Sequence, residues 1–350
     1  MAALFSFLHR QHAFALDLSD NAISLLETHG GLRPHVAAWS RVELPAGILE
    51  DGLILDQEKL AEAIRRAMDE ATPAPPATKQ VVAELPESRT FVHHFTIERD
   101  VDVKEFPDIV LARAEDTLPV NLEEYVWDYE ILAQSDAGYE VLFAAAPVEL
   151  VQTYEQTLAL AGLKLEVLEL ESMALMRAAL KSGIPAPAEA VALMDLGGRV
   201  TTIAVVDAAG LRLSVTIPVA GDALTAGISK KLKLKPEEAE KRKRAKGFKD
   251  ADVAKAMESV LAPLIEEFSA ARLFYETRYP QKLTRVLIAG GSSALPGIGD
   301  VLARQLGVPV ELASSPFEIP NVSSSQTMVV SGIALRAAKL SPGLSFIMGA

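Results

Sequence analysis

The sequence contains no cysteine, and it has no uninterrupted apolar run of the roughly 18 residues that a membrane-spanning helix needs. The first absence excludes disulfides, thiol catalysis and thiolate metal sites. The opening residues MAALFSFLHRQHAF lack a basic region and a small-residue cleavage site, so they do not resemble a signal peptide. With 49% apolar and 23% charged residues over 350 positions, we expect an intracellular, soluble chain that folds as two or more packed units.

Several catalytic and metal-binding signatures are also missing. There is no Gly-x-Ser-x-Gly and no Walker P-loop, so hydrolase and P-loop functions have no support. The six histidines show no metal-ligand spacing supported by nearby carboxylates, and His93 and His94 on one strand would point to opposite faces. We therefore predict no histidine-based metal site.

Charge is distributed unevenly. The net charge is −13, but residues 230–249 hold ten basic and three acidic side chains, a local charge of +7. Such a run can contact nucleic acid or anionic lipid, yet it is more often the solvated face of a helix. Because the remainder is strongly acidic, we expect no nucleic-acid partner.

Two segments repeat one pattern. Residues 12–44 (HAFALDLSDNAISLLETHGGLRPHVAAWSRVEL) and 190–219 (AVALMDLGGRVTTIAVVDAAGLRLSVTIPV) each read as strand, tight turn, strand, glycine turn, strand. Either the chain has two related halves or two β meanders are similar by chance. Helical spacing follows the first repeat, residues 81–165 read as a compact α+β unit, and residues 252–279 read as one long helix kinked at Pro263. The class is α/β.

The second repeat carries the clearest phosphate-binding pattern. After Asp195 come Gly197, Gly198, Thr201 and Thr202. Small residues let backbone N–H groups approach phosphate oxygens, hydroxyls can donate to the same oxygens, and an aspartate at a strand end can hold hydrated Mg²⁺. A plain turn explains these residues equally well when they are taken alone. A second glycine-rich turn at residues 288–293 (IAGGSS), between a strand and a helix, strengthens the phosphate interpretation.

Three motifs in order give a family resemblance. Asp-Leu at residue 17, DLGGRVTT at residue 195 and IAGGSSALPG at residue 288 resemble the phosphate 1, phosphate 2 and adenosine motifs of the actin-like ATPase superfamily. ELPESRTFVHHFTI, AEDTLPVNLEEYVWDYEIL and EVLFAAAPVELVQTYEQTLALAGLKLEVLELESMAL resemble the inserted domain of the PilM family, cytoplasmic proteins of type IV pilus assembly. PVAGDALTAGISKKL, LKPEEAEKRK and LPGIGDVLARQLGVPVEL continue the likeness over nearly the whole chain.

The resemblance implies an actin-like (ribonuclease H-like) fold of two halves with a small α+β insert. Its expected parts are residues 1–80 with 166–190 for the first half, 81–165 for the insert, 191–220 with 284–350 for the second half, and 221–283 for an added subdomain. It implies that Asp17 and Asp195 bind Mg²⁺ and phosphate. The other implied ATP contacts are Gly197, Gly198, Thr201, Thr202, Glu240, Lys243, Arg244, Gly290, Gly291 and Ser292.

The phosphate 1 motif departs from the family pattern, which usually reads like D-I-G-S-S-S-V-K. Ser19 stands at the glycine, Asp20 at the hydroxyl residue and Ser24 at the lysine. Each lost charge-assisted hydrogen bond costs about 1.5–3 kcal/mol, and ~1.4 kcal/mol is a tenfold change in affinity. We therefore expect weak ATP binding and negligible hydrolysis rather than an active enzyme. Alternatively, Asp17 and Asp20 together hold Mg²⁺ and partly restore nucleotide binding.

The resemblance also implies a partner and a location. Family members are expected to bind the N-terminal cytoplasmic tail of a PilN-like single-span membrane protein, alongside other inner-membrane assembly components, so the chain would be cytoplasmic and held peripherally at the inner membrane. The expected groove lies between the insert and the first half, near residues 81–85 and 90–97. A small-molecule kinase and an FtsA-like cell-division protein are the alternatives; neither a sugar-binding loop nor a basic amphipathic C-terminal helix is recognisable.

Overall fold

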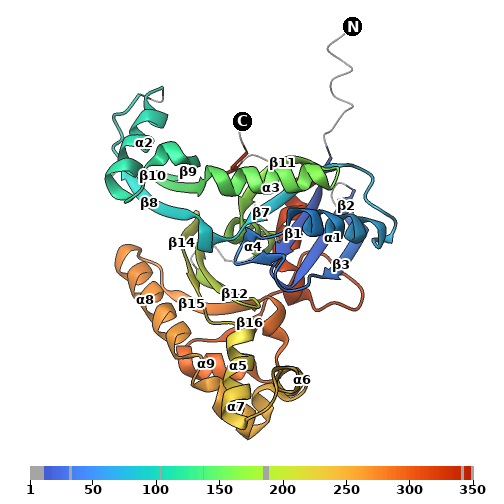
Figure 1. Ribbon diagram of the computed structural model, residues 1–350. Helices are drawn as coiled ribbons and strands as arrows, with labels where there is room; N and C mark the ends of the chain where they lie inside the picture. Colours follow the sequence, from blue (N-terminus) through green and yellow to red (C-terminus); the bar gives the residue numbers. More distant parts are fainter. Residues whose placement is uncertain are drawn as a thin grey trace. The chain divides into compact units, whose positions relative to one another are not determined.

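The computed structural model describes residues 12–30, 34–102, 104–136, 138–183, 189–339 and 343–347 (Figure 1). The chain forms two compact units. Unit 1 comprises residues 1–174 and 329–350, and unit 2 comprises residues 175–328. Among the described residues, none of the helices has the length and apolarity required to cross a bilayer.

Unit 1 is built on a six-stranded sheet. Its order is β11 (Lys164–Leu170), β7 (Gln80–Leu85), β1 (Phe14–Ser19), β2 (Ala22–His29), β3 (His35–Glu43) and β6 (Thr72–Pro73). Its other elements are β4 (Leu49–Glu50), β5 (Leu53–Ile54), α1 (Gln57–Asp69), α3 (Val148–Leu160), the start of α4 (Glu171–Lys181) and nearly all of α10 (Met328–Ala337). Helix α1 begins where Asp56 accepts a hydrogen bond from Lys59 N, and its apolar face is buried.

Unit 2 is built on a five-stranded sheet. Its order is β14 (Gly210–Ile217), β13 (Thr201–Asp207), β12 (Ala190–Leu196), β15 (Leu283–Ala289) and β16 (Val310–Leu312). Its helices include α5 (Gly221–Leu232), α6 (Pro236–Lys246), α7 (Ala251–Glu258), α8 (Ala262–Arg278) and α9 (Ile298–Leu306). The predicted long helix over residues 252–279 is two helices, because the chain leaves helical pairing at Ser259 and α8 starts anew with Pro263 in its first turn.

The two sheets share one topology. In unit 1, β1, β2 and β3 form an antiparallel meander, and β7 and β11 add in parallel beside β1. In unit 2, β12, β13 and β14 form the meander, and β15 and β16 add in parallel beside β12. The repeated sequence pattern therefore reflects a repeated arrangement of five strands, and not a chance similarity of two meanders.

A small α+β insert belongs to unit 1. It contains β8 (Phe91–Ile97), α2 (Phe106–Thr117), β9 (Tyr125–Ser135) and β10 (Gly138–Pro147), with the strands in the order β8-β10-β9. Apolar and aromatic side chains between α2 and the sheet form a separate core. The insert is narrower than residues 81–165, because β7 and β11 flank each other in the main sheet and α3 contacts α1 and β11.

The C-terminal segment also differs from the sequence-based boundaries, which assign residues 284–350 to the second half. Residues 329–350 cluster with unit 1. Arg336 Nη1 lies 2.7 Å from Glu169 Oε2 in a fully buried ion pair, and Phe346 N donates to Leu168 O at 2.8 Å. Gly332 leaves no room for a Cβ beside the carbonyl of Ala174. These contacts with β11 and α4 hold the segment in unit 1.

Candidate functional site

The β1–β2 turn is closed by its own side chains. Ser19 Oγ donates to Ala22 O at 2.9 Å, and Asp20 Oδ1 accepts from Asp51 N at 2.8 Å. Asp51 has a positive φ of 50° and its carboxylate pairs with Arg89 at 2.7 Å. The side chain of Asp20 is thus used to hold the β4–β5 turn, which weakens the alternative in which Asp17 and Asp20 share Mg²⁺.

A polar row crosses the meander of unit 1. Asp17 on β1 lies opposite Ser24 on β2, and Ser24 lies opposite Arg41 on β3. Arg41 Nη1 donates to Ser24 Oγ at 2.9 Å. Burial raises the pKa of Asp17 to about 6, although the Arg41 charge and a Ser24 hydrogen bond act in the opposite direction. The sequence motif has lost its lysine at position 24, but the next strand supplies a guanidinium beside the same aspartate.

A second carboxyl group lies next to Asp17. Glu84, near the end of β7, is buried, and its Oε1 accepts from Leu18 N at 3.1 Å. Its Oε2 is buried without a hydrogen-bond partner among the described residues. Burial and the Asp17 charge raise the pKa of Glu84 well above its ordinary value. On the far side, Glu84 lies opposite Glu169 of β11.

In unit 2, glycines and backbone carbonyls form the β12–β13 turn. Gly197 O accepts from Ser292 Oγ at 3.0 Å and from Gly221 N at 3.2 Å, and Gly198 O accepts from Asp222 N at 2.8 Å. The first turn of α5 therefore holds this turn in place. Gly290 has a φ of 82°, and a Cβ there would collide with Asp195 Oδ1 and lie 2.7 Å from Leu196 O. Two predicted motifs, at residues 195–198 and 290–292, thus meet in unit 2.

The two predicted threonines are divided between faces. Thr202 lies opposite Asp195 in the β12–β13 pairing, whereas Thr201 is one position away and points to the other face of the sheet. Thr201 Oγ1 donates to Val219 O at 2.6 Å and is fully buried. We conclude that only Thr202 shares the face of Asp195, and that Thr201 anchors the strand before α5.

Helix α6 places Glu240 and Lys243 against the first turns of α5. Lys243 is 4% exposed and its Nζ contacts Gly221 O at 2.8 Å, Thr225 Oγ1 at 2.8 Å and Glu240 Oε2 at 2.7 Å. Burial opposes ionisation of Glu240, but hydrogen bonds from Lys243, Thr225 and Arg244 outweigh it and lower its pKa to about 2. Arg244 is 76% exposed. All three ammonium protons of Lys243 thus have acceptors within unit 2.

The site residues missed from the sequence are Arg41 and Glu84. Hairpin register would have placed Arg41 opposite Ser24, since residues on adjacent antiparallel strands face each other in pairs. Glu84 is signalled by an acid at the carboxyl end of a buried apolar strand, where α/β sheets place ligand-binding side chains. Of the residues that were predicted, Asp17 lies in unit 1, and the other eleven lie in unit 2.

The duplicated five-stranded arrangement with two strand–turn–strand motifs defines an actin-like ATPase fold. A family model described as type IV pilus assembly protein PilM matches residues 15–338, and the chain belongs to that family. The chain is similar to a chain of a PilM–PilN type IV pilus biogenesis complex, with 23% identity over 94% of this chain and 99% of that one and a TM-score of 0.82.

More distant structures share the fold. The ethanolamine utilization protein EutJ from Carboxydothermus hydrogenoformans is 20% identical over 93% of this chain and 89% of its own, with a TM-score of 0.55. MreB 5 of Spiroplasma citri, bound to AMPPNP, is 13% identical over 93% and 96%, with a TM-score of 0.53. The expected actin-like fold with an α+β insert is confirmed.

Proposed function

We propose that this protein is a scaffold of a type IV pilus-like assembly machine that binds the N-terminal cytoplasmic tail of a PilN-like, single-span inner-membrane protein. The observation that carries the proposal is the similarity over 94% of the chain to a protein described in complex with PilN. Family membership favours this role over the kinase and cell-division alternatives.

The pairing of the strands limits which strand a partner tail could dock against. Residues 81–85 were one expected position, but β7 pairs with β1 on one side and β11 on the other, and Val81–Leu85 are buried. A strand paired on both sides cannot accept another. Strand β8 lies at an edge of the insert's sheet and pairs with β10 among the described strands. We infer that the tail adds in extended form beside β8, a recurring mode of peptide recognition.

A titration with tail peptides tests the docking. The purified full chain should bind a synthetic tail peptide, and a peptide N-methylated at alternate residues should lose binding because strand addition requires its backbone N–H groups. Thr96→Arg on the exposed face of β8 should weaken binding, whereas Gln134→Arg on β9, the opposite edge, should not. Equal binding of the methylated and unmodified peptides would exclude strand addition.

Tethering predicts the location. If the partner tail holds the chain at the inner membrane, deleting that tail should move the protein into the soluble fraction of the cell. Deletion of the partner's periplasmic part, with the tail and span kept, is the matched control and should leave the protein at the membrane. Membrane association that survives tail deletion would mean that other inner-membrane assembly components hold it.

The nucleotide site is proposed to be weak. In unit 1 the carboxylates of Asp17 and Asp20 repel phosphate oxygens, while Arg41 supplies one countercharge. Mg²⁺ held by Asp17 or by Asp195 would neutralise phosphate charge. Isothermal titration with ATP and Mg²⁺ tests this: we expect affinity weaker than micromolar and negligible release of phosphate, and tight binding would contradict it.

A further inference from the structure

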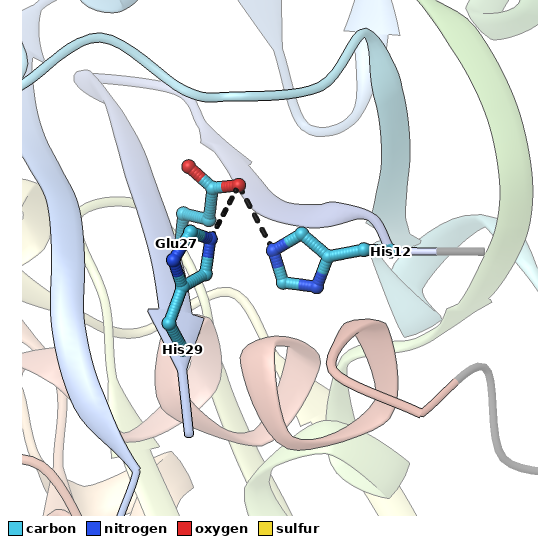
Figure 2. A group of neighbouring side chains, drawn as sticks. All are labelled: His12, Glu27 and His29. Atoms are coloured by element: carbon cyan, nitrogen blue, oxygen red, sulfur yellow. Dashed lines mark hydrogen bonds and ion pairs between the residues drawn. The ribbon is translucent and has the colours of Figure 1, made fainter. Parts of the chain in front are cut away.

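Two histidines and a buried glutamate converge in unit 1, at the end of β2. His12 Nε2 lies 2.9 Å and His29 Nε2 lies 3.2 Å from the same atom, Glu27 Oε1 (Figure 2). The three ligand atoms all lie within 4.8 Å of one another. The expectation that no histidine has a supporting carboxylate is therefore wrong at this position, because the carboxylate and His12 are brought together by strand pairing.

Strand geometry explains the convergence. Glu27 and His29 are two positions apart on β2, so their side chains point to the same face. Strand β1 runs antiparallel to β2 with Ala15 opposite Leu26, and continuing this register places His12, two residues before β1, beside the end of β2. The rings of His12 and His29 meet edge to face at 4.7 Å between centroids.

The glutamate is held firmly, and the histidines are reachable. Glu27 is 1% exposed, and its second oxygen, Oε2, accepts a hydrogen bond from Ala77 N at 2.9 Å. That bond fixes the carboxylate so that Oε1 is directed at the two rings, as outer hydrogen bonds do for metal ligands. The side chains of His12 and His29 are 28% and 42% exposed. A cation can therefore enter from solvent and keep a water ligand.

We propose that His12, Glu27 and His29 form a binding site for Zn²⁺. Two imidazole nitrogens and one carboxylate are a donor set that Zn²⁺ accepts, with a fourth position open to water. At bond lengths of roughly 2.0–2.1 Å, tetrahedral geometry separates ligand atoms by roughly 3.3 Å. The two observed Nε2–Oε1 separations lie close to that value. On binding, each ring carries its proton on Nδ1, and Nε2 donates its lone pair to the metal.

The competing explanation is a metal-free cluster, in which the two rings donate hydrogen bonds to a buried carboxylate and nothing else binds. That cluster needs no open approach and gains nothing from a soft divalent ion. The two explanations differ in one measurable property, since only a metal site has an affinity for Zn²⁺ that depends on both rings at once. Under either explanation, a surface histidine away from Glu27 should have no effect on the affinity for Zn²⁺.

Zn²⁺ titration of chelator-treated, purified full chain tests the proposal. Competition with a chromophoric chelator should give one site per chain, and His12→Ala and His29→Ala should each weaken binding by roughly tenfold or more. His35→Ala is the matched control, because His35 is exposed and its ring lies 6.3 Å from that of His29 without reaching Glu27; it should bind as the unmodified chain does. Glu27→Gln should also weaken binding.

A folding readout guards against misfolded variants. Zn²⁺ should raise the melting temperature of the unmodified chain and of His35→Ala, and it should raise those of His12→Ala and His29→Ala by less, since stabilisation by a ligand of the native state falls with its affinity. Circular dichroism must show the same secondary structure for all four proteins. Absence of one-to-one binding, or equal affinity after either His12→Ala or His29→Ala, would overturn the site.

Discussion

Equivalent strands of the two units carry different side chains at their carboxyl ends. In unit 1, the carboxyl ends of β1, β7 and β11 place Asp17, Glu84 and Glu169 side by side. In unit 2, the corresponding edge has Asp195 with Ala289 opposite it. Beside Asp195, Gly290 leaves no room for a Cβ, which would collide with the Asp195 carboxylate. One topology therefore supports three neighbouring carboxylates in one half and one carboxylate beside a glycine turn in the other.

The duplicated sheet therefore constrains where a site can lie but not which side chains form it. Each unit also contains a buried arginine–carboxylate pair, but the two pairs connect different kinds of segments. Arg336 with Glu169 joins the C-terminal segment to β11, whereas Arg212 with Asp207 lies within the β13–β14 hairpin at 2.8 Å. Matched substitutions in the two units measure how far their chemistry differs.

The largest effect is expected from Arg336→Leu. This change leaves Glu169, which is 0% exposed, without the Nη1 donor at 2.7 Å and also removes donors to Leu344 O and Gly343 O. Breaking one partner of a buried pair costs about 3–5 kcal/mol. Urea denaturation should show that loss in the free energy of unfolding.

Arg212→Leu is the matched change in unit 2. Asp207 would keep hydrogen bonds from Ala209 N and from the Tyr275 hydroxyl, each at 2.9 Å, so we expect a smaller loss of about 1.5–3 kcal/mol. A larger loss for Arg212→Leu than for Arg336→Leu would reverse the ranking of the two pairs.

The next effect is expected at the glycine turn of unit 2. Gly290→Ala forces a Cβ into Asp195 at a positive φ, and we expect it to lower the free energy of unfolding by about 2–4 kcal/mol. Gly291→Ala is the adjacent control, because a Cβ there meets nothing within 4 Å and the φ is not positive. Thermal unfolding that is equal for the two variants would contradict the close packing of this turn.

Features of the fold that depend on residues near one another in the sequence could be predicted, and features that join distant residues could not. The repeat, the turn positions and the meanders are local patterns, and the fold class predicted from them is confirmed, whereas the nucleotide contacts assigned to the unit 2 motifs stay a prediction. The parallel addition of β7 and β11 pairs strands that are distant in sequence, so residues 80–85 read equally well as part of the insert. Arg336 and Glu169 are 167 positions apart, and no local signal joins them.

Stability should depend on pH in opposite directions in the two units. The folded-state pKa of Asp17 is about 6, above the 3.8 of an unperturbed aspartate, so its burial costs nothing below pH 4 and its full amount above pH 6. Stability should therefore fall by about 2–3 kcal/mol as pH rises through this window. The lowered pKa of Glu240 acts oppositely, because its contribution is present above pH 4.5 and is lost as pH falls toward 2.

The matched variant is Asp17→Asn, which cannot ionise. The difference in free energy of unfolding between the two proteins, measured by urea titration from pH 4 to pH 7, should grow in favour of Asp17→Asn. Glu240→Gln should lose stability relative to the unmodified chain over the same range and should not show that slope. A flat difference for Asp17→Asn would mean that Arg41 and Ser24 neutralise the cost of burial.

The smallest effect is expected from giving unit 1 the turn chemistry of unit 2. Ser19→Gly with Asp20→Ser removes a side chain and a carboxylate from the phosphate approach, and we expect ATP–Mg²⁺ affinity to rise about tenfold, equivalent to ~1.4 kcal/mol. Asp20→Ser alone is the control, since it also removes the acceptor for Asp51 N at 2.8 Å. Titration calorimetry would show an affinity unchanged by the pair of substitutions if Asp17, and not the turn, sets the repulsion.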